Sequence, residues 1–338
     1  MARGGPPFAG SGRRVGMGEA EDAGDRADVT FTSLDDILFD GAGATKRDLV
    51  DHLDAVSGRI LPELEGRALS VIRARPGQPP FMQKNLPKST PDWVRRTSHW
   101  AEGSKRDVTY ALCDDRRTLL WFANQRAVEY HPAMVRDAEG TATHLVVDLD
   151  PPEGAPFAAV VGAAALVRRA LAESGLDGAV KTSGSKGLHV FVPVAEGTPV
   201  EDAAAATRAI VARVERLGPD ETTTAFTKAD RAGKVFLDAT RSGSGTVVAA
   251  YSPRIRPGAP VSFPVRWDDL EQVVPGDFTI RTASVLLGDG DPWRDAMPAP
   301  VELPGDLVED GRAIPLGRVE AMHEGKRRAR GVRDPKGS

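Results

Sequence analysis

The stretch His144-Leu-Val-Val-Asp-Leu-Asp150 decides the fold, because it reads as a short buried strand that ends in two aspartates. The sequence around it predicts alternating elements in a fixed order. After the strand come an apolar helix at 156–171 closed by Gly175, strands at 179–183 and 188–194, a helix at 201–217 ended by Gly218, and a strand at 234–239. The order β-α-β-β-α-β is the ferredoxin-like arrangement that RNA-recognition modules also use. We therefore expect an α+β fold with an RRM/ferredoxin-like catalytic subdomain.

The preceding region, 29–132, is expected to mix a helix with strands. Leu49, Leu53 and Val56 recur at helical spacing after Thr45, a plausible N-cap. Residues 68–73 and 118–122 read as strands because they are short runs rich in apolar residues.

Four regions are expected along the chain. Residues 1–28, Gly- and Ala-rich with an acidic run, are interpreted as a disordered leader. An N-terminal α/β subdomain covers 29–141, and the RRM-like subdomain with flanking strands covers 142–291. An extension at 292–338 ends in a basic tail with Lys326, Arg327, Arg328 and Arg330. Such charge runs are usually solvated, and a contact with phosphates is the alternative.

The composition is that of an ordinary globular protein, with 41% hydrophobic and 27% charged residues among 338. The one cysteine, Cys113, excludes an internal disulfide and a cysteine-rich zinc site, and fits a reducing cytoplasm. No apolar run is long enough to span a membrane, and no signal peptide is recognisable. The net charge of -4 leaves nucleic-acid binding open, because local patches decide it.

Three carboxylates carry the chemical prediction. Asp148 and Asp150 share one face of their strand, so their like charges need a cation or basic partners. An isolated Asp-x-Asp is more often a solvated strand end. In a ferredoxin-like sheet, however, the first strand lies beside the fourth, which carries Asp238. Three convergent carboxylates suit two Mg²⁺ or Mn²⁺ ions, which can activate a 3′-hydroxyl and neutralise a triphosphate.

A Gly-rich turn, Lys181-Thr-Ser-Gly-Ser-Lys-Gly-Leu-His189, leads into the third strand. Its glycines let backbone N–H groups approach phosphate oxygens. Ser183, Ser185, Lys186 and His189 add donors and charge, although the pattern alone is equally that of a plain hairpin turn. Further cations surround Asp238 in the sequence: Lys228, Arg231, Lys234, Arg241, Arg254 and Arg256.

These motifs resemble those of the archaeo-eukaryotic primase superfamily. More narrowly, 144–152, 181–190 and Val235-Phe-Leu-Asp238 resemble the polymerase domain of bacterial ligase D and its stand-alone Prim-PolC relatives. The resemblance extends over 29–291 and includes the blocks Pro80-Phe-Met-Gln-Lys-Asn85, Pro91-Asp-Trp-Val94, Leu120-Trp-Phe-Ala-Asn124, Glu129-Tyr-His-Pro132 and Tyr251-Ser-Pro-Arg254.

The resemblance implies a role for each matching position. Asp148, Asp150 and Asp238 would be catalytic metal ligands. The implied nucleotide-binding residues are Arg73, His131, Ser183, Lys186, His189, Arg231 and Arg254. The implied DNA-binding residues are Lys46, Phe81 and Lys84, with Phe81 stacking on the template.

Two departures from the ligase D pattern bear on the pathway. Met82 stands where a second aromatic is usual, and Asp36 stands where a lysine would help to bind a 5′-phosphate, while Lys46 is kept. An aspartate reverses the charge at that contact, so we favour gap filling over end joining.

The sequence is thus interpreted as a DNA-dependent primase-polymerase that extends 3′ ends and favours ribonucleotides. Expected partners are gapped or primed DNA, NTP or dNTP, and a DNA ligase with other repair proteins, for a monomer in the cytoplasm at the nucleoid. An end-joining polymerase acting with a separate ligase and Ku is the alternative. A metal-dependent phosphohydrolase or nuclease stays open. An RNA-recognition module is disfavoured, because Asp148, Asp150 and His189 stand where it needs exposed aromatics.

Overall fold

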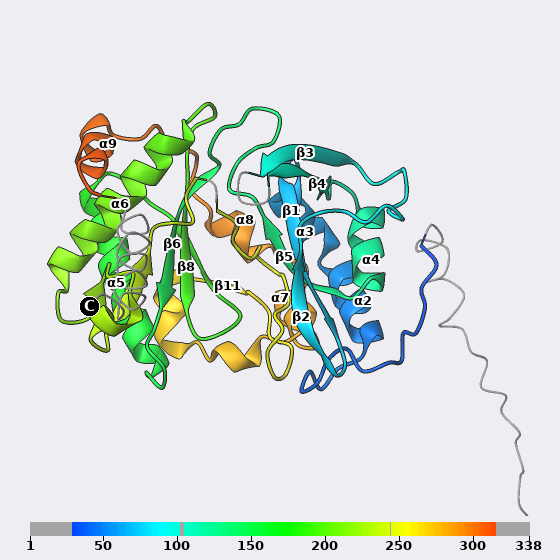
Figure 1. Ribbon diagram of the computed structural model, residues 1–338. Helices are drawn as coiled ribbons and strands as arrows, with labels where there is room; N and C mark the ends of the chain where they lie inside the picture. The colour runs from blue at the N-terminus through cyan, green and yellow to red at the C-terminus, as the bar shows by residue number, and fades with distance from the viewer. Residues whose placement is uncertain (1–28, 102–104, 244, 316–338) are drawn as a thin grey trace, which may run out of the picture.

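The computed structural model describes residues 29–101, 105–243 and 245–315 (Figure 1). Two β-sheets stand side by side, and most helices lie on their outer sides (Figure 1). The predicted acidic leader and the basic tail lie outside the described residues.

The elements have the following bounds. The α-helices are α2 (Lys46–Ala55), α3 (Ser57–Leu64), α4 (Arg116–Asn124), α5 (Phe157–Glu173), α6 (Val200–Leu217), α7 (Ala283–Leu287), α8 (Pro292–Ala296) and α9 (Gly305–Arg312). The strands are β1 (Ala68–Arg75), β2 (Gln78–Gln83), β3 (Arg96–Ala101), β4 (Arg106–Leu112), β5 (Ala127–Pro132), β6 (His144–Asp150), β7 (Ala179–Thr182), β8 (Leu188–Pro193), β9 (Thr222–Thr223), β10 (Val235–Asp238) and β11 (Pro264–Val265). Short 3₁₀ helices are η1 (Lys228–Arg231), η2 (Trp267–Gln272) and η3 (Pro275–Asp277). None of the helices among these residues is long and apolar enough to cross a bilayer.

The first sheet has five strands in the order β2-β1-β4-β3, with β5 also paired to β1. Helix α2 begins where the sequence predicts, because Thr45 and Asp48 form a reciprocal capping box. The backbone N–H of Thr45 donates to the Asp48 carboxylate at 2.7 Å. The predictions of this helix and of a strand from Ala68 are confirmed.

The predicted strand at 118–122 is wrong, because this run belongs to helix α4. The Asp115 side chain accepts the backbone N–H of Thr118 at 2.7 Å and so caps the helix. Leu119, Leu120 and Phe122 are all buried. A run that is apolar at successive positions does not distinguish a strand from a buried helix, and here the N-cap and the packing decide.

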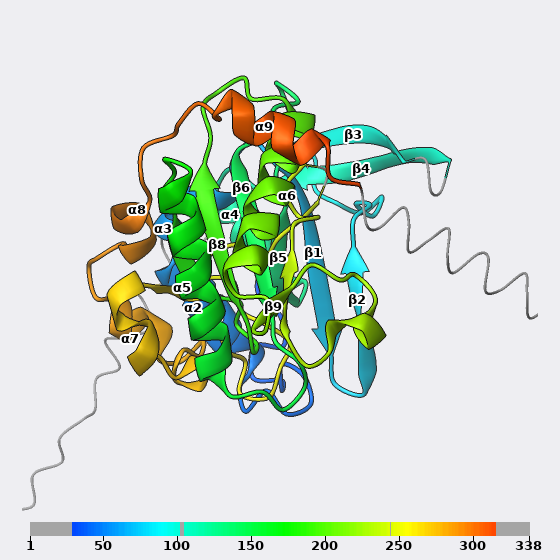
Figure 2. The same ribbon diagram turned by 90° about the vertical axis from the view of Figure 1, so that its left-hand side faces the viewer.

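The second sheet has six strands in the order β11-β7-β8-β6-β10-β9. The chain passes through β6, α5, β7, β8, α6 and β10, which is the predicted order of elements. Strand β6 lies between β8 and β10, and pairs with both in antiparallel fashion. Seen from the side, α5 and α6 lie over one face of this sheet, and the first sheet lies beyond its other face (Figure 2).

Strand register brings the predicted polar residues together. Asp148 is the direct partner of Asp238 on β10 and of His189 on β8. Val147 and Leu149 alternate with the aspartates and are buried. The carboxylates therefore stand on the face that α5 and α6 leave open, toward the first sheet.

Candidate active site

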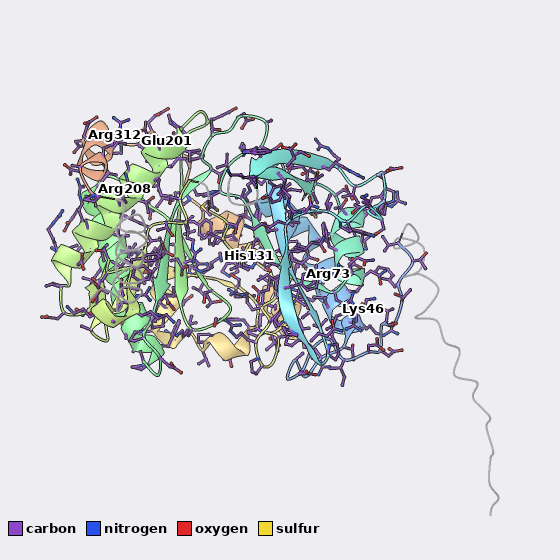
Figure 3. All side chains as sticks on the ribbon, viewed as in Figure 1. Lys46, Arg73, His131, Glu201, Arg208 and Arg312 are labelled. Atoms are coloured by element: carbon purple, nitrogen blue, oxygen red, sulfur yellow. The ribbon has the colours of Figure 1, made fainter. Side chains whose placement is uncertain are left out.

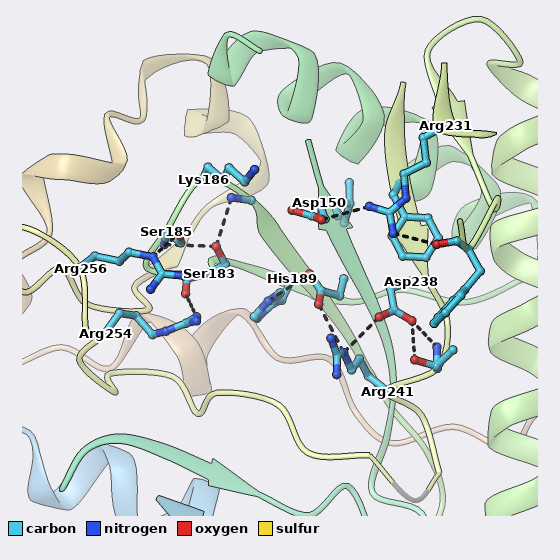
Figure 4. A pocket seen from close by; sticks show the side chains of 16 residues that line it. Asp150, Ser183, Ser185, Lys186, His189, Arg231, Asp238, Arg241, Arg254 and Arg256 are labelled. Atoms are coloured by element: carbon cyan, nitrogen blue, oxygen red, sulfur yellow. Dashed lines mark hydrogen bonds and ion pairs between the residues drawn. The ribbon is translucent and has the colours of Figure 1, made fainter. Parts of the chain in front are cut away.

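A pocket of about 530 Å³ opens on this face of the second sheet (Figure 4). Eight of the predicted catalytic and nucleotide-binding residues line it: Asp148, Asp150, Ser183, Lys186, His189, Arg231, Asp238 and Arg254. They come from β6, from the β7–β8 turn, from β8, from η1, from β10 and from the segment after it. Ser185, Arg241 and Arg256 also line the pocket. Residues far apart in the chain thus meet around one polar cavity.

Arginines hold the three carboxylates. The Arg241 Nε lies 3.4 Å from an oxygen of Asp148 and 3.3 Å from an oxygen of Asp238. The Arg231 Nη1 lies 3.3 Å from an oxygen of Asp150. Burial by itself raises the pKa of Asp148, but the neighbouring His189, Arg241 and Lys181 lower it to about 2. Asp148 is therefore ionised at neutral pH.

A threonine that the sequence reading did not single out fixes the Asp238 carboxylate. One oxygen of Asp238 accepts the backbone N–H of Thr240 at 2.8 Å and its hydroxyl at 2.6 Å. An aspartate that accepts a backbone N–H two residues later is a common local motif, so the pattern Asp-x-Thr was a usable signal. This bond leaves the second oxygen to face Arg241.

The donor set fits a divalent cation in chemistry and in register. Carboxylate oxygens from two paired strands are the ligands that Mg²⁺ and Mn²⁺ prefer. Within the described residues, however, no group of three or more His, Cys, Asp or Glu side chains is gathered closely enough to hold a metal. The Arg241 guanidinium lies between Asp148 and Asp238 instead. The strand pairing thus brings the three aspartates together, as expected, but their carboxylate groups are not gathered around one point.

The turn between β7 and β8 is built around Ser183. Its hydroxyl oxygen accepts the backbone N–H groups of Ser185 at 3.2 Å and of Gly187 at 3.1 Å. Gly184 has a φ of +67°, and a Cβ there would lie 2.5 Å from the Arg254 Cγ, so the position requires glycine. Arg254 in turn donates to the Ser183 carbonyl at 2.5 Å. The exposed Lys186 is at the tip of this turn.

His189 is buried between a lysine and a carboxylate. Its Nδ1 lies 2.9 Å from the Lys181 Nζ, and its Nε2 lies 3.4 Å from an oxygen of Asp148. Burial lowers the pKa of His189 to about 4, so the imidazole is neutral at neutral pH.

Arg231 reaches the pocket along an aromatic ring. Its guanidinium lies 3.7 Å from the centroid of Phe236, and it also donates to the carbonyls of Ala225 and Phe226, each at 3.3 Å. These contacts orient the arginine toward Asp150.

His131 does not line the pocket and connects to it through Glu129. The His131 Nε2 lies 2.9 Å from a Glu129 oxygen, and the Arg254 Nε lies 3.0 Å from the same oxygen. The other Glu129 oxygen accepts the backbone N–H of Ile255 at 2.8 Å. Glu129 is 2% exposed. Its contacts with His131 and Arg254 link the first sheet to the pocket. No local pattern assigned it this role, because its partners lie far along the chain.

Four further predicted residues lie outside the pocket, and Figure 3 shows Arg73 and Lys46 on the side of the first sheet. Arg73 donates to the Gln125 carbonyl at 2.7 Å and to the Gln83 side chain at 2.9 Å. Lys46 is buried and donates to the Thr32 carbonyl at 2.5 Å. Phe81 and Lys84 are exposed on and just after β2. The structure thus brings neither Arg73 to the nucleotide pocket nor Lys46 to the surface.

A model of the family described as LigD, primase-polymerase domain, matches residues 45–293, which include every residue of the pocket. The chain belongs to the LigD primase-polymerase family. The expected resemblance to the polymerase domain of bacterial ligase D is confirmed, and so is the enzyme class, since this domain is a nucleotidyltransferase. Membership also implies dependence on a divalent metal.

Relatives and a solved structure agree with this membership. The chain is 36% identical over 255 residues to the multifunctional non-homologous end joining DNA repair protein LigD of Mycobacterium tuberculosis, covering 72% of the chain and 33% of that protein. It is 33% identical over 259 residues to the bifunctional non-homologous end joining protein LigD of Bacillus subtilis, covering 75% of the chain and 41% of that protein. The polymerase domain of M. tuberculosis ligase D in complex with DNA superposes with a TM-score of 0.73 at 33% identity, over 79% of this chain and 97% of that one. The chain therefore spans about a third of the length of the M. tuberculosis LigD protein that it matches.

Proposed function

We propose that this member of the LigD primase-polymerase family extends 3′ ends of primed or gapped DNA by nucleotidyl transfer. The observation that carries the proposal is the pairing of Asp148 with Asp238 on neighbouring strands, opposite a turn that presents Lys186. Five cationic side chains line the pocket against three carboxylates. This excess of positive charge suits a triphosphate that arrives with divalent ions.

Each pocket residue has a proposed task. Asp148, Asp150 and Asp238 would hold two Mn²⁺ or Mg²⁺ ions, which neutralise triphosphate charge and lower the pKa of the attacking hydroxyl. Lys186 and Arg254 bind phosphate oxygens, and Ser183 keeps the turn in shape for that contact. Arg231 and His189 bind the nucleotide from either side of Asp148 and Asp150, and Glu129 holds His131 next to Arg254.

The DNA is proposed to bind at the first sheet. Phe81 is 47% exposed and Met82 is 46% exposed on β2, and the exposed Lys84 follows. Exposed aromatics can stack on bases, at about 1–3 kcal/mol per base, and a lysine can contact phosphate. In this proposal the two sheets are subdomains, 29–141 and 142–291, arranged as in archaeo-eukaryotic primases, and 292–338 is an extension.

The favoured pathway is the filling of short gaps in excision repair, with ribonucleotides as the preferred substrates. In this proposal the protein acts as a cytoplasmic monomer at the nucleoid, and a DNA ligase seals its product. Asp36 supports this choice, because a carboxylate that pairs with Arg126 at 2.8 Å offers a 5′-phosphate none of the positive charge that a lysine would supply. The names of the relatives favour a second candidate, an end-joining polymerase that acts with a separate ligase and Ku.

Primer extension on short gapped DNA tests both. The substrates carry or lack a downstream 5′-phosphate, with Mn²⁺ or Mg²⁺ and with ribo- or deoxyribonucleotides. We expect extension by the wild-type chain, with little dependence on the 5′-phosphate, and none by Asp148→Asn/Asp150→Asn. Asp268→Asn/Asp269→Asn changes two exposed carboxylates outside the pocket and serves as the matched control. Extension by the folded Asp148→Asn/Asp150→Asn protein would refute the site, and strong dependence on the 5′-phosphate would favour end joining.

A further inference from the structure

Lys181 is completely buried in the sheet beneath the pocket, and the proposed reaction gives it no task. It lies on β7 directly opposite His189 on β8. Its Nζ is 2.9 Å from the His189 Nδ1 and 2.6 Å from the Ser262 hydroxyl oxygen. Burying a lysine is costly, and burial lowers the pKa of Lys181 well below its usual range. The hydrogen bonds that Lys181 makes must offset this cost, so their partners indicate its role.

Ser262 decides the direction of the hydrogen bond that it shares with Lys181. The Ser262 hydroxyl donates its only proton to the Thr182 carbonyl at 2.8 Å. Its oxygen can then only accept from the Lys181 Nζ. The other contact of the Lys181 Nζ, to the His189 Nδ1, also needs a donor and an acceptor.

The far side of the imidazole assigns that contact. The His189 Nε2 lies 3.4 Å from an oxygen of Asp148, and an ionised carboxylate can only accept hydrogen bonds. An Nε2 lone pair facing this oxygen would be repelled, so Nε2 carries the hydrogen. The Lys181 Nζ carries further hydrogens beside the one it donates to Ser262 and lies 2.9 Å from Nδ1, so Nζ is the donor and Nδ1 the acceptor. The chain of donors runs from Lys181 through His189 to Asp148.

We propose that Lys181 is a positioning residue that fixes His189 in the Nε2–H tautomer, so that the imidazole presents a hydrogen-bond donor to the pocket. This donor contacts Asp148 in the free protein and a phosphate oxygen of the nucleotide in the complex. The opposite tautomer would turn a lone pair toward these anionic oxygens and weaken the binding of the nucleotide. The inference rests on the proposed function of the pocket only for the identity of this ligand.

Nitrogen NMR of the histidine rings tests the tautomer directly. The full chain is labelled with ¹⁵N-histidine, and the His189 signals are assigned from their loss in His189→Gln. We expect a protonated Nε2 and an unprotonated Nδ1 in the wild-type protein. We expect Lys181→Met, which keeps the length of the side chain and removes the donor, to shift His189 toward the Nδ1–H form. A wild-type Nδ1–H tautomer would overturn the inference, and this measurement requires no folded variant at position 181. An unchanged tautomer in folded Lys181→Met would overturn it as well.

Nucleotide kinetics then separate positioning from mere structural support. We expect Lys181→Met to raise the KM for the nucleotide by about tenfold, as for the loss of one hydrogen bond to a charged group, with a smaller change in kcat. The same substitution in a His189→Gln background should raise the KM little further, because Lys181 acts through His189. A full tenfold effect in that background would overturn the inference. A wild-type chain that extends no primer would refute the polymerase proposal and leave the tautomer result standing.

Discussion

Glu129→Gln removes one negative charge from the link between the first sheet and the pocket. Glutamine keeps the shape of the side chain and can still accept the backbone N–H of Ile255. It leaves the partly buried Arg254 guanidinium, 3.0 Å from the lost charge, without its anionic partner. We therefore expect a large loss of folding free energy from a substitution that removes no apolar contact.

The pKa of Glu129 gives the magnitude. Burial by itself raises this pKa, but the hydrogen bond to His131 and the charge of Arg254 lower it from 4.5 to about 2. At about 1.4 kcal/mol per unit of pKa, the ionised carboxylate contributes about 3 kcal/mol at neutral pH. Because the folded pKa is the lower one, this contribution is complete above about pH 4.5 and is lost as the pH falls toward 2.

Urea unfolding followed by circular dichroism measures the effect. At pH 7 we expect Glu129→Gln to lower the free energy of unfolding by about 3 kcal/mol, and at pH 4 the difference from wild type should be about 1 kcal/mol smaller. Asp268→Asn is the matched control, since Asp268 pairs with Arg168 at 3.0 Å on the surface with 72% of its side chain exposed. An exposed pair of this kind contributes at most about 1 kcal/mol. A loss below about 1 kcal/mol for Glu129→Gln, or a difference independent of pH, would refute the role assigned to this carboxylate.

Three further substitutions test other contacts. Arg241→Met should tighten Mn²⁺ binding in calorimetry and lower the Tm of the metal-free protein, because a guanidinium no longer competes for Asp148 and Asp238; unchanged affinity would contradict this. Gly187→Ala should lower the free energy of unfolding in urea by about 1–3 kcal/mol, since its Cβ would lie 2.2 Å from the Leu149 carbonyl oxygen. Gly58→Ala, in a helix with open space around it, should cost nothing, and equal effects of the two substitutions would argue against the close approach at Gly187. Asp115→Ala should cost about 1 kcal/mol in the same assay by removing the cap of α4, and a stability equal to wild type would show that the cap contributes nothing.

Local patterns were sufficient wherever neighbours in the chain decide the structure. Thr45 and Asp48 cap α2 within one turn, and helical spacing placed its apolar face correctly. The order of elements from β6 to β10 followed from periodicity and from glycines at helix ends. Once that order was known, the ferredoxin-like rule placed Asp148 beside Asp238, and the strand register agrees with it.

Packing overrides a local pattern at one element beside the first sheet. The run at 118–122 was assigned to a strand from its apolar residues, although a cap at Asp115 and burial on the first sheet make it helical. Arg73 was expected at the nucleotide by resemblance, and the structure places its side chain on the first sheet, outside the pocket. It contacts the Gln125 carbonyl and the Gln83 side chain, and its guanidinium lies 5.5 Å from the centroid of the Phe81 ring.

The sequence by itself determined the family, the order of the elements and the presence of three carboxylates on one face of a sheet. Only the tertiary structure decided which charges meet: Arg241 between Asp148 and Asp238, Glu129 beside Arg254, and Lys181 beneath His189. The reason is physical. Periodicity, caps and turns depend on residues a few positions apart, whereas Glu129 and Arg254 are brought together only when two sheets pack, and the low-dielectric interior then makes their partnership strong.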